Sequence, residues 1–290
     1  MTFKDSLKTK DFVVTAHLNM ADVSDPSTLL KQAAILKSAV DGVQVTDSIQ
    51  EPIGAIATAA LLIQQGIDPI VHMNCRDRNR IALEKDFMGA TALGVTSVLI
   101  RRGTKILKSP KVGIKNVFDT TALEFMAYIN SLKEDTNSSV VSDFHIGANA
   151  EIFEPDLNWV PKNLIRKCEA GSNFIQLQIC FDMEVLRKYM SQIVASKLTH
   201  SVNFIVSLSP LPSADVARWM RDNIKGALVP DFVIERMDQA SNPESEGVTI
   251  CAEMLRESRT IPGISGANLL TMGKLEDIPA AIDASGVRTN

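Results

Sequence analysis

Polar side chains that can move a proton or hydrogen-bond a ligand stand at the ends of short apolar runs in this sequence. Imidazole, carboxyl, amide, hydroxyl and guanidinium groups are all present. They are His17, Thr46, Asp47, His72, Asn74, Arg101, Arg102, Asn149, Glu151 and Gln178. If the runs are parallel strands of one sheet, their ends meet at one edge, and these groups share one site.

The apolar runs have the length and spacing of strands in a repeating strand–helix unit. They begin at Phe12, Val40, Ile67, Ser97, Ser142, Asn173, Asn203 and Thr260. The first four begin about thirty residues apart, which fits one strand and its crossover helix. Eight such units predict an α/β fold, a closed (β/α)8 TIM barrel, in which active sites gather at the carboxyl ends of the strands.

Helical patterns lie between the runs. The helix after the first run is predicted to start with Ser24 or Asp25 as its N-cap and Pro26 at its first position. Gly94 is well placed to end a later helix. Composition does not break anywhere along the chain, so residues 1–290 are predicted to form a single TIM-barrel domain.

Composition and charge narrow the class of protein. The 290 residues carry a net charge of −4 with a pI near 5.7, which gives no electrostatic reason to expect nucleic acid or a membrane surface as partner. The polar start, residues 1–12, lacks the apolar core of a signal peptide. We therefore expect a cytoplasmic protein with a small-molecule ligand, and self-association into a homo-oligomer stays open.

Four cysteines are far apart and form no CxxC pair, which predicts reduced structural thiols. Cys75 is the exception to consider as a nucleophile, because Arg76 or His72 could stabilise a thiolate there. A metal centre from His17, His72, Cys75 and Asp47 is a further alternative, although no HxH or HxxxH pair exists. The prediction is no metal site.

Two intervals are longer than one helix requires. Between Gly103 and Ser142 a basic stretch precedes the expected helix, and it is either a lid or cofactor-contacting loop, or a solvated surface excursion. Between Pro210 and Ile261 two or three helical segments are expected.

Several strand-end segments together resemble the methylenetetrahydrofolate reductase family. The resemblance runs over roughly residues 10 to 270 and is most specific from the third to the fourth strand. The segments are TAHLN, DGVQVTD, DPIVHMNCRDRNRIALEKDFMGATALGVTSVLIRRG, IGANAE, LIRKCEAGSNFIQLQICFD, PDFVIERMDQA and GVTICAEML.

The resemblance implies a TIM barrel with FAD at the carboxyl ends of the strands and hydride transfer from NAD(P)H to methylenetetrahydrofolate. It assigns flavin contacts to Thr46, His72, Arg102 and Lys167, and the pterin contact to Gln178. A guanidinium stabilises the negative charge of a reduced flavin, and a side-chain amide can match the alternating donors and acceptors of a pterin edge.

Further positions follow from these assignments. His17 and Asn74 are expected beside Gln178 in a pocket for tetrahydrofolate, and Glu151 is what remains of a family motif after the fifth strand. Strand alternation sends one of Arg101 and Arg102 inward and the other outward.

The sequence departs from the family pattern where the chemistry takes place. His17 stands where the family has a glutamate general acid, and Thr104 stands where it has an aspartate. An imidazole can replace a carboxyl as proton donor, whereas a hydroxyl can only hydrogen-bond.

Three functions are therefore open. The first is a reductase that interconverts methylene- and methyltetrahydrofolate with His17 as its acid. The second is a flavin-independent, tetrahydrofolate-dependent methyltransferase or demethylase, and the third is a non-catalytic folate-binding subunit.

Overall fold

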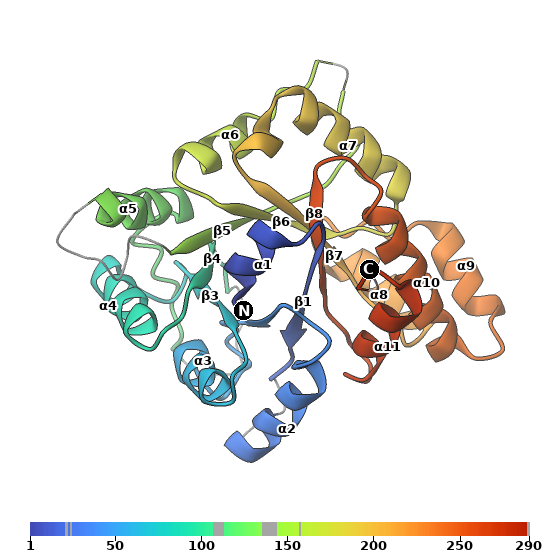
Figure 1. The fold of residues 1–290 in the computed structure, drawn as a ribbon, viewed down its shortest axis with the longest axis horizontal. Helices are drawn as coiled ribbons and strands as arrows, with labels where there is room; N and C mark the ends of the chain where they lie inside the picture. Colours follow the sequence, from blue (N-terminus) through green and yellow to red (C-terminus); the bar gives the residue numbers. More distant parts are fainter. Residues whose placement is uncertain (21–22, 24, 107–112, 135–143, 157, 289–290) are drawn as a thin grey trace.

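Eight parallel strands close into a barrel in which each strand pairs with its neighbours in chain order, from β1 round to β8 and back (Figure 1). The computed structural model describes residues 1–290 apart from 21–22, 24, 107–112, 135–143, 157 and 289–290. The strands are β1 Val13–Leu18, β2 Gly42–Val45, β3 Pro69–Asn74, β4 Ser97–Arg101, β5 His145–Ala150, β6 Phe174–Ile179, β7 Asn203–Leu208 and β8 Ile264–Leu269. The predicted TIM barrel is confirmed.

Helices cover the outside of the barrel. They are α2 Pro26–Leu36, α3 Ala55–Gln64, α4 Arg80–Ala92, α5 Ala122–Glu134, α6 Lys162–Glu169, α7 Met183–Ala195, α8 Ala214–Asn223, α9 Asp231–Gln239, α10 Pro243–Ser258 and α11 Asp277–Ser285, with a short 3-10 turn η1 Leu198–His200. The long interval before β8 contains three of them, α8 to α10. Apolar side chains between helices and strands form one continuous core.

The predicted signals at helix ends act as expected. Asp25 is the N-cap of α2, where its carboxylate accepts from the backbone N–H of Thr28 at 2.9 Å, and Pro26 occupies the first turn. Ser24, the alternative cap, lies outside the described residues. Gly94 follows α4 with φ +92°, a left-handed conformation that glycine adopts without strain and that ends the helix.

A further helix, α1 Phe3–Thr9, lies across the amino-terminal end of the barrel (Figure 1). Its composition is polar, but the Phe3 side chain is fully buried and packs edge-on against the Phe174 ring at 5.2 Å. Thr2 and Asp5 form a capping box, and Asp68 accepts from the Phe3 N–H at 2.7 Å. α1 therefore closes this end of the barrel.

The barrel interior is apolar in its lower part, next to α1, and polar in its upper part, toward the carboxyl ends of the strands. The lower layer consists of Val13, Ile70, Leu99, Phe174 and Ile205, with Phe3 beneath it. Above it the alternation of each strand brings polar side chains inward. They include Thr15, His17, Gln44, His72, Gln176 and Asn268. Bulky branched residues usually fill a TIM barrel, so this polar upper part marks the end where a ligand can bind.

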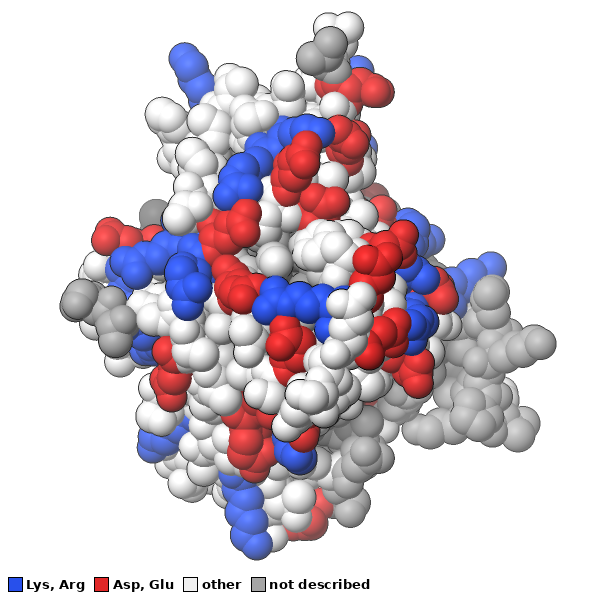
Figure 2. All heavy atoms as spheres, turned by 90° about the vertical axis from the view of Figure 1, so that its right-hand side faces the viewer, with Lys and Arg blue, Asp and Glu red and all other residues white. Residues whose placement is uncertain are grey.

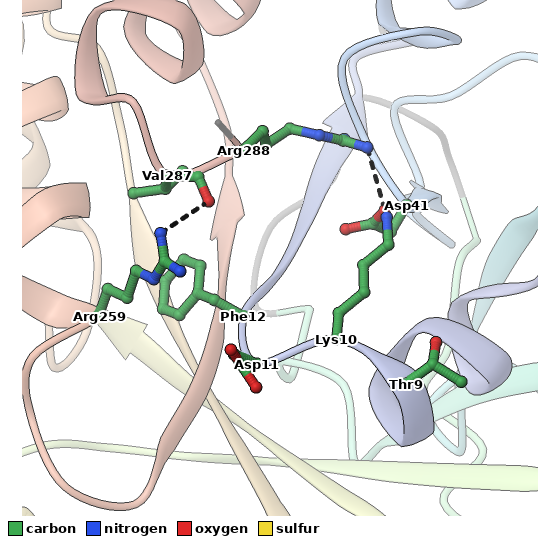
Figure 3. Close-up of a pocket in the computed structure, with 8 residues that line it drawn as sticks. All are labelled: Thr9, Lys10, Asp11, Phe12, Asp41, Arg259, Val287 and Arg288. Carbon is green, nitrogen blue, oxygen red and sulfur yellow. Dashed lines mark hydrogen bonds and ion pairs between the residues drawn. The ribbon is translucent and has the colours of Figure 1, made fainter. Parts of the chain in front are cut away.

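Charged groups join the two chain ends next to α1. Figure 3 shows Lys10 and Arg288 converging on Asp41, whose side chain is only 4% exposed; the N···O distances are 2.5 and 3.2 Å. Asp41 also accepts from the Val14 N–H at 2.9 Å, and Arg259 donates to the Val287 carbonyl at 3.2 Å. These contacts hold the end of the chain against the start of β1.

The outer face formed by the last helices carries mixed charge. Figure 2 shows basic and acidic side chains interspersed over it, and several are ion-paired, such as Arg236 with Glu253 at 2.5 Å and Arg221 with Asp231 at 2.8 Å. This face therefore has no large patch of one sign among its described residues. Within the described chain, no helix combines the length and apolarity needed to cross a bilayer.

Truncating the side chain of Phe3 should destabilise the protein strongly. Phe3→Ala removes a fully buried ring from the barrel floor, and such losses usually cost about 3–5 kcal/mol of unfolding free energy. Urea unfolding followed by circular dichroism measures it, with exposed Lys8→Ala on the same helix as control. Equal stability of the two variants would contradict a closing role for α1.

Candidate functional site

The amide of Gln44 is the centre of a hydrogen-bond network inside the upper barrel. Its Oε1 lies 2.7 Å from Nε2 of His17 and 2.9 Å from Nε2 of His72. Its Nε2 donates to Gln176 Oε1 at 2.6 Å and towards Thr15 Oγ1 at 3.3 Å. Thr15 in turn donates to Asn268 Oδ1 at 2.9 Å. The network thus links side chains of β1, β2, β3, β6 and β8.

Arg101 sets the direction of these hydrogen bonds. A guanidinium has donors only, so Nη1 of Arg101, 3.5 Å from Nδ1 of His72, requires that nitrogen to accept. The proton of His72 is then on Nε2 and is donated to Gln44. Because Gln44 Oε1 can only accept, His17 also donates from Nε2, which leaves its Nδ1 as an acceptor.

Both imidazoles are held neutral. Burial, together with the positive charge of Arg101, lowers the pKa of His17 to about 4, and burial lowers the pKa of His72 well below its ordinary value. The rings meet edge-on with centroids 5.2 Å apart. At neutral pH, His17 is therefore a hydrogen-bonding group, and its imidazolium form appears only in acid.

Three adjoining cavities form the mouth of the barrel above this network. The β2–β4 cavity, about 310 Å³, is lined by Thr46, Asp47, Glu51, Asn74, Arg76, Arg101 and Thr104, among others. The central cavity, about 100 Å³, is lined by residues that include His17, Arg101, Asn149, Glu151 and Gln178. The β5–α6 cavity, about 550 Å³, is lined by Asn149, Glu151, Phe153, Trp159, Lys167 and Tyr189, among others. Shared residues connect the first cavity to the second and the second to the third.

The predicted folate-binding residues divide between these cavities. Gln178 and Glu151 line the central cavity with His17. The Gln178 amide is engaged with backbone, since Nε2 donates to the Lys225 carbonyl at 3.0 Å and Oε1 accepts from the Ile179 N–H at 3.0 Å. Glu151 pairs with Lys225 at 2.9 Å. Gln178 can contact a ligand after exchanging these bonds.

Asn74 lies in the β2–β4 cavity with Thr46 instead. Its side chain donates to the Asp47 carbonyl, and its N–H donates to the Asp47 carboxylate at 3.2 Å. Arg78 holds that carboxylate with two contacts, at 2.6 and 3.2 Å. Asn74 thus fixes the strand end that carries Asp47.

Of the two consecutive arginines, Arg101 points into the barrel. It lines both the β2–β4 and the central cavity. Arg102 is exposed, with its guanidinium 4.9 Å from the ring centroid of Phe118. After it, Gly103 has φ +80°, and a Cβ there would meet Cβ of Arg76 at 2.7 Å, so only glycine allows this close turn. Thr104 is exposed at the cavity edge, and its carbonyl accepts from Arg76 at 3.5 Å.

The alternative chemistries at Cys75 gain no support. Cys75 is fully buried, and burial raises the pKa of its thiol to about 11, so it is not an activated thiolate. Among the described residues, no three His, Cys, Asp or Glu side chains gather as metal ligands.

Part of the long interval predicted as a lid or surface excursion, residues 107–112 and 135–143, lies outside the described residues. In its described part, Val117 donates to the Arg76 carbonyl at 2.7 Å.

Two important side chains were not anticipated from the sequence, Gln44 and Glu51. Gln44 has the same signal as Gln178, an amide inside an otherwise apolar barrel strand, where an unpaired amide costs about 1–3 kcal/mol. Glu51 gives no such signal, because it lies in the irregular segment between β2 and α3.

The protonation states can be checked directly. We expect ¹⁵N nuclear magnetic resonance at neutral pH to show His17 and His72 as neutral Nε2–H tautomers, with His17 titrating near pH 4. In Gln44→Met, which removes the shared acceptor, both ring signals should change. His200, outside the network, is the control. Titration of His17 at its ordinary value near 6.5 would contradict its burial as a neutral ring, and an Nδ1–H tautomer would contradict the hydrogen-bond direction.

Comparisons with known proteins agree on the family. A family model described as methylenetetrahydrofolate reductase matches residues 3–286. A probable methylenetetrahydrofolate reductase (NADPH) of Caenorhabditis elegans is 22% identical over 237 residues, which are 79% of this chain and 34% of that protein. Methylenetetrahydrofolate reductase 2 of Schizosaccharomyces pombe is 24% identical over 188 residues, 63% of this chain and 29% of that protein. The chain thus matches about a third of the length of these relatives.

A solved structure supports the fold. A protein from Clostridium thermocellum, which binds two copies of 5-methyl-5,6,7,8-tetrahydrofolic acid, has a TM-score of 0.62 and 16% identity, covering 97% of this chain and 96% of that one. Because the family model covers nearly the whole chain, the protein belongs to the methylenetetrahydrofolate reductase family.

Proposed function

We propose that the protein is a one-carbon tetrahydrofolate enzyme that interconverts the methylene and methyl forms at the carboxyl ends of its strands. The observation that carries the proposal is the polar upper barrel, in which His17, Arg101 and Gln178 meet at one cavity in a chain of this family. The folate bound by the Clostridium thermocellum protein of the same fold supports the ligand class.

The central cavity offers complementary groups for a pterin. His17 presents an acceptor, Arg101 presents donors and a positive charge, and the Gln178 amide presents both a donor and an acceptor. The cavity alone holds about 100 Å³, so the ligand must extend into a neighbouring cavity. Asn149 and Glu151 line the passage to the β5–α6 cavity.

The side chains assigned to FAD by resemblance do not fit a flavin as a set. His72 is 1% exposed with both ring nitrogens engaged, and Arg102 stacks on Phe118. Thr46 lines the β2–β4 cavity and donates to Glu51, whereas Lys167 lines the β5–α6 cavity and donates to the Asn149 carbonyl at 2.6 Å. The four side chains therefore do not line one cavity in which a flavin could contact them together.

The overall reaction needs a hydride and a proton. Methylenetetrahydrofolate gains a hydride from NAD(P)H and one proton, giving methyltetrahydrofolate and NAD(P)⁺. His17 would supply that proton only as an imidazolium, which its burial confines to a pH near 4. Near neutral pH its Nδ1 can instead accept a hydrogen bond from a pterin N–H. Thr104, at the rim of the β2–β4 cavity, can hydrogen-bond the ligand.

A second candidate is flavin-free methyl transfer between a donor and tetrahydrofolate. The poor fit of the flavin residues favours it, because such a reaction requires no hydride. A folate-binding protein without catalysis is the third outcome that the experiments below distinguish.

Gln178 should contribute to folate affinity. Gln178→Ala is expected to weaken methyltetrahydrofolate binding by about 1 kcal/mol or more, the scale of one lost hydrogen bond, in isothermal calorimetry. Gln192→Ala on α7, a partly buried glutamine that lines none of the three cavities, serves as control. Unchanged affinity in Gln178→Ala would remove this residue from the site.

Turnover without flavin distinguishes the candidate reactions. We expect the purified protein to oxidise NAD(P)H in the presence of methylenetetrahydrofolate, at a rate that added FAD does not raise. A yellow protein whose activity depends on FAD would contradict our reading of the flavin residues. Folate binding without NAD(P)H oxidation would contradict the reductase proposal, and candidate methyl donors would then be tested.

A further inference from the structure

Two carboxyl groups, Asp47 and Glu51, line the β2–β4 cavity. Both belong to the segment that follows β2, and Arg101 of β4 lines this cavity as well as the central one with His17. A ligand that reaches across Arg101 therefore meets both the imidazole and these carboxyl groups.

The two carboxyl groups have different surroundings. Asp47 is neutralised by Arg78, which is itself held by Asp86 at 2.6 Å. Glu51 is half-buried and is held by uncharged donors, the Thr46 hydroxyl on Oε1 and the Ser48 N–H on Oε2 at 3.1 Å. Two carboxyls whose environments separate their proton affinities commonly divide acid and base roles.

The charges around Glu51 come from several elements. Asp47 lies on its own segment, Arg76 and Arg78 follow β3, and Arg101 ends β4. Arg78 is committed to Asp47 and Asp86, and Arg76 to Asp77 at 2.6 Å. The acid form of Glu51 thus lies between a neighbouring carboxylate and arginines that are mostly paired.

We propose that Glu51 is the proton donor to the bound one-carbon folate in this protein. The proposal rests on the function proposed above and gives Glu51 the part that the resemblance assigned to the residue at position 17. It stands on the position of Glu51 in the cavity, on the lack of an ion pair to Glu51 among the described residues, and on the donor role of His17 towards Gln44.

The proton affinity of the group agrees with this role. Burial, reinforced by the negative charge of Asp47, raises the pKa of Glu51 to about 7. A raised pKa keeps the carboxyl protonated below that pH and removes the proton above it. The acid form is therefore abundant near neutral pH, where the imidazolium of His17 is not.

The step is balanced without any further reactant. The methylene carbon of the folate bridges N5 and N10. As its bond to N10 breaks, the bonding electron pair goes to N10, which takes the proton of Glu51, and the N5 lone pair forms the N5=CH₂⁺ double bond. Glu51 becomes a carboxylate beside the new cation, which then accepts a hydride from the nicotinamide.

Turnover provides the first test. In Glu51→Gln we expect the rate of NAD(P)H oxidation to fall by about 10²–10⁴-fold, the usual effect of losing a positioned proton donor. The loss of wild-type rate as pH rises through about 7 should also disappear. Glu51→Asp should restore part of both, and methyltetrahydrofolate affinity should change little.

Glu154→Gln, which replaces an exposed carboxyl paired with Lys188, is the matched control. Wild-type rate and pH profile in Glu51→Gln would overturn the proposal.

Infrared difference spectroscopy tests the proposal without turnover. Adding methyltetrahydrofolate to the wild-type protein below pH 7 should shift the band of a protonated carboxyl, and Glu51→Gln should lack that band. If the protein binds folate but does not oxidise NAD(P)H, the proposed reductase function is wrong. The shift of the carboxyl band would still place Glu51 against the ligand. Binding without any such shift overturns the role of Glu51, whatever the turnover.

Discussion

The upper barrel buries many polar groups that need hydrogen-bond partners, and the Gln44 amide satisfies several of them, while Nδ2 of Asn268 has no partner among the described residues. One acceptor serves two imidazoles, and one NH₂ group serves Gln176 and Thr15. An unpaired group at this depth would cost about 1–3 kcal/mol. The hydrogen-bond directions in the network therefore depend on one another, and Arg101 at one end determines which atoms donate and which accept.

Periodicity was enough to predict the fold. Eight apolar runs at near-regular spacing allow few other arrangements, and local signals such as Asp25 with Pro26, and Gly94, act through backbone chemistry that is independent of the rest of the molecule. Helix α1 was not predicted because its segment is mostly polar, with Phe3 and Leu7 as its apolar side chains. Two apolar side chains are too few to establish a periodic pattern, and only the open barrel floor makes Phe3 a core residue.

The candidate site was predictable at its strand ends and less so beyond them. Because Leu99 belongs to the inner layer, alternation along β4 brings Arg101 inward and Arg102 outward, which strand counting alone could decide once the register was known. The amide partners of Gln178 could not be anticipated, since Lys225 lies on the far side of α8 in the sequence. The position of Glu51 depends on the irregular segment between β2 and α3, where the residue type says little about which way the side chain points.

The direction of the hydrogen bonds also explains why a carboxylate suits position 17 poorly in this chain. Arg101 makes His72 donate to Gln44 Oε1, and the same oxygen faces the side chain at position 17. A group there must donate, which a neutral imidazole does and an ionised carboxyl does not. Gln44 and Arg101 inside the barrel thus disfavour an ionised carboxyl at the end of β1. Under the proposed function, the proton donor then comes from a neighbouring element. The carboxyl groups that share a cavity with Arg101 at that end of the barrel are those of Asp47, Glu51 and Glu151. Asp47 pairs with Arg78 and Glu151 with Lys225, whereas Glu51 accepts, among the described residues, only from uncharged groups.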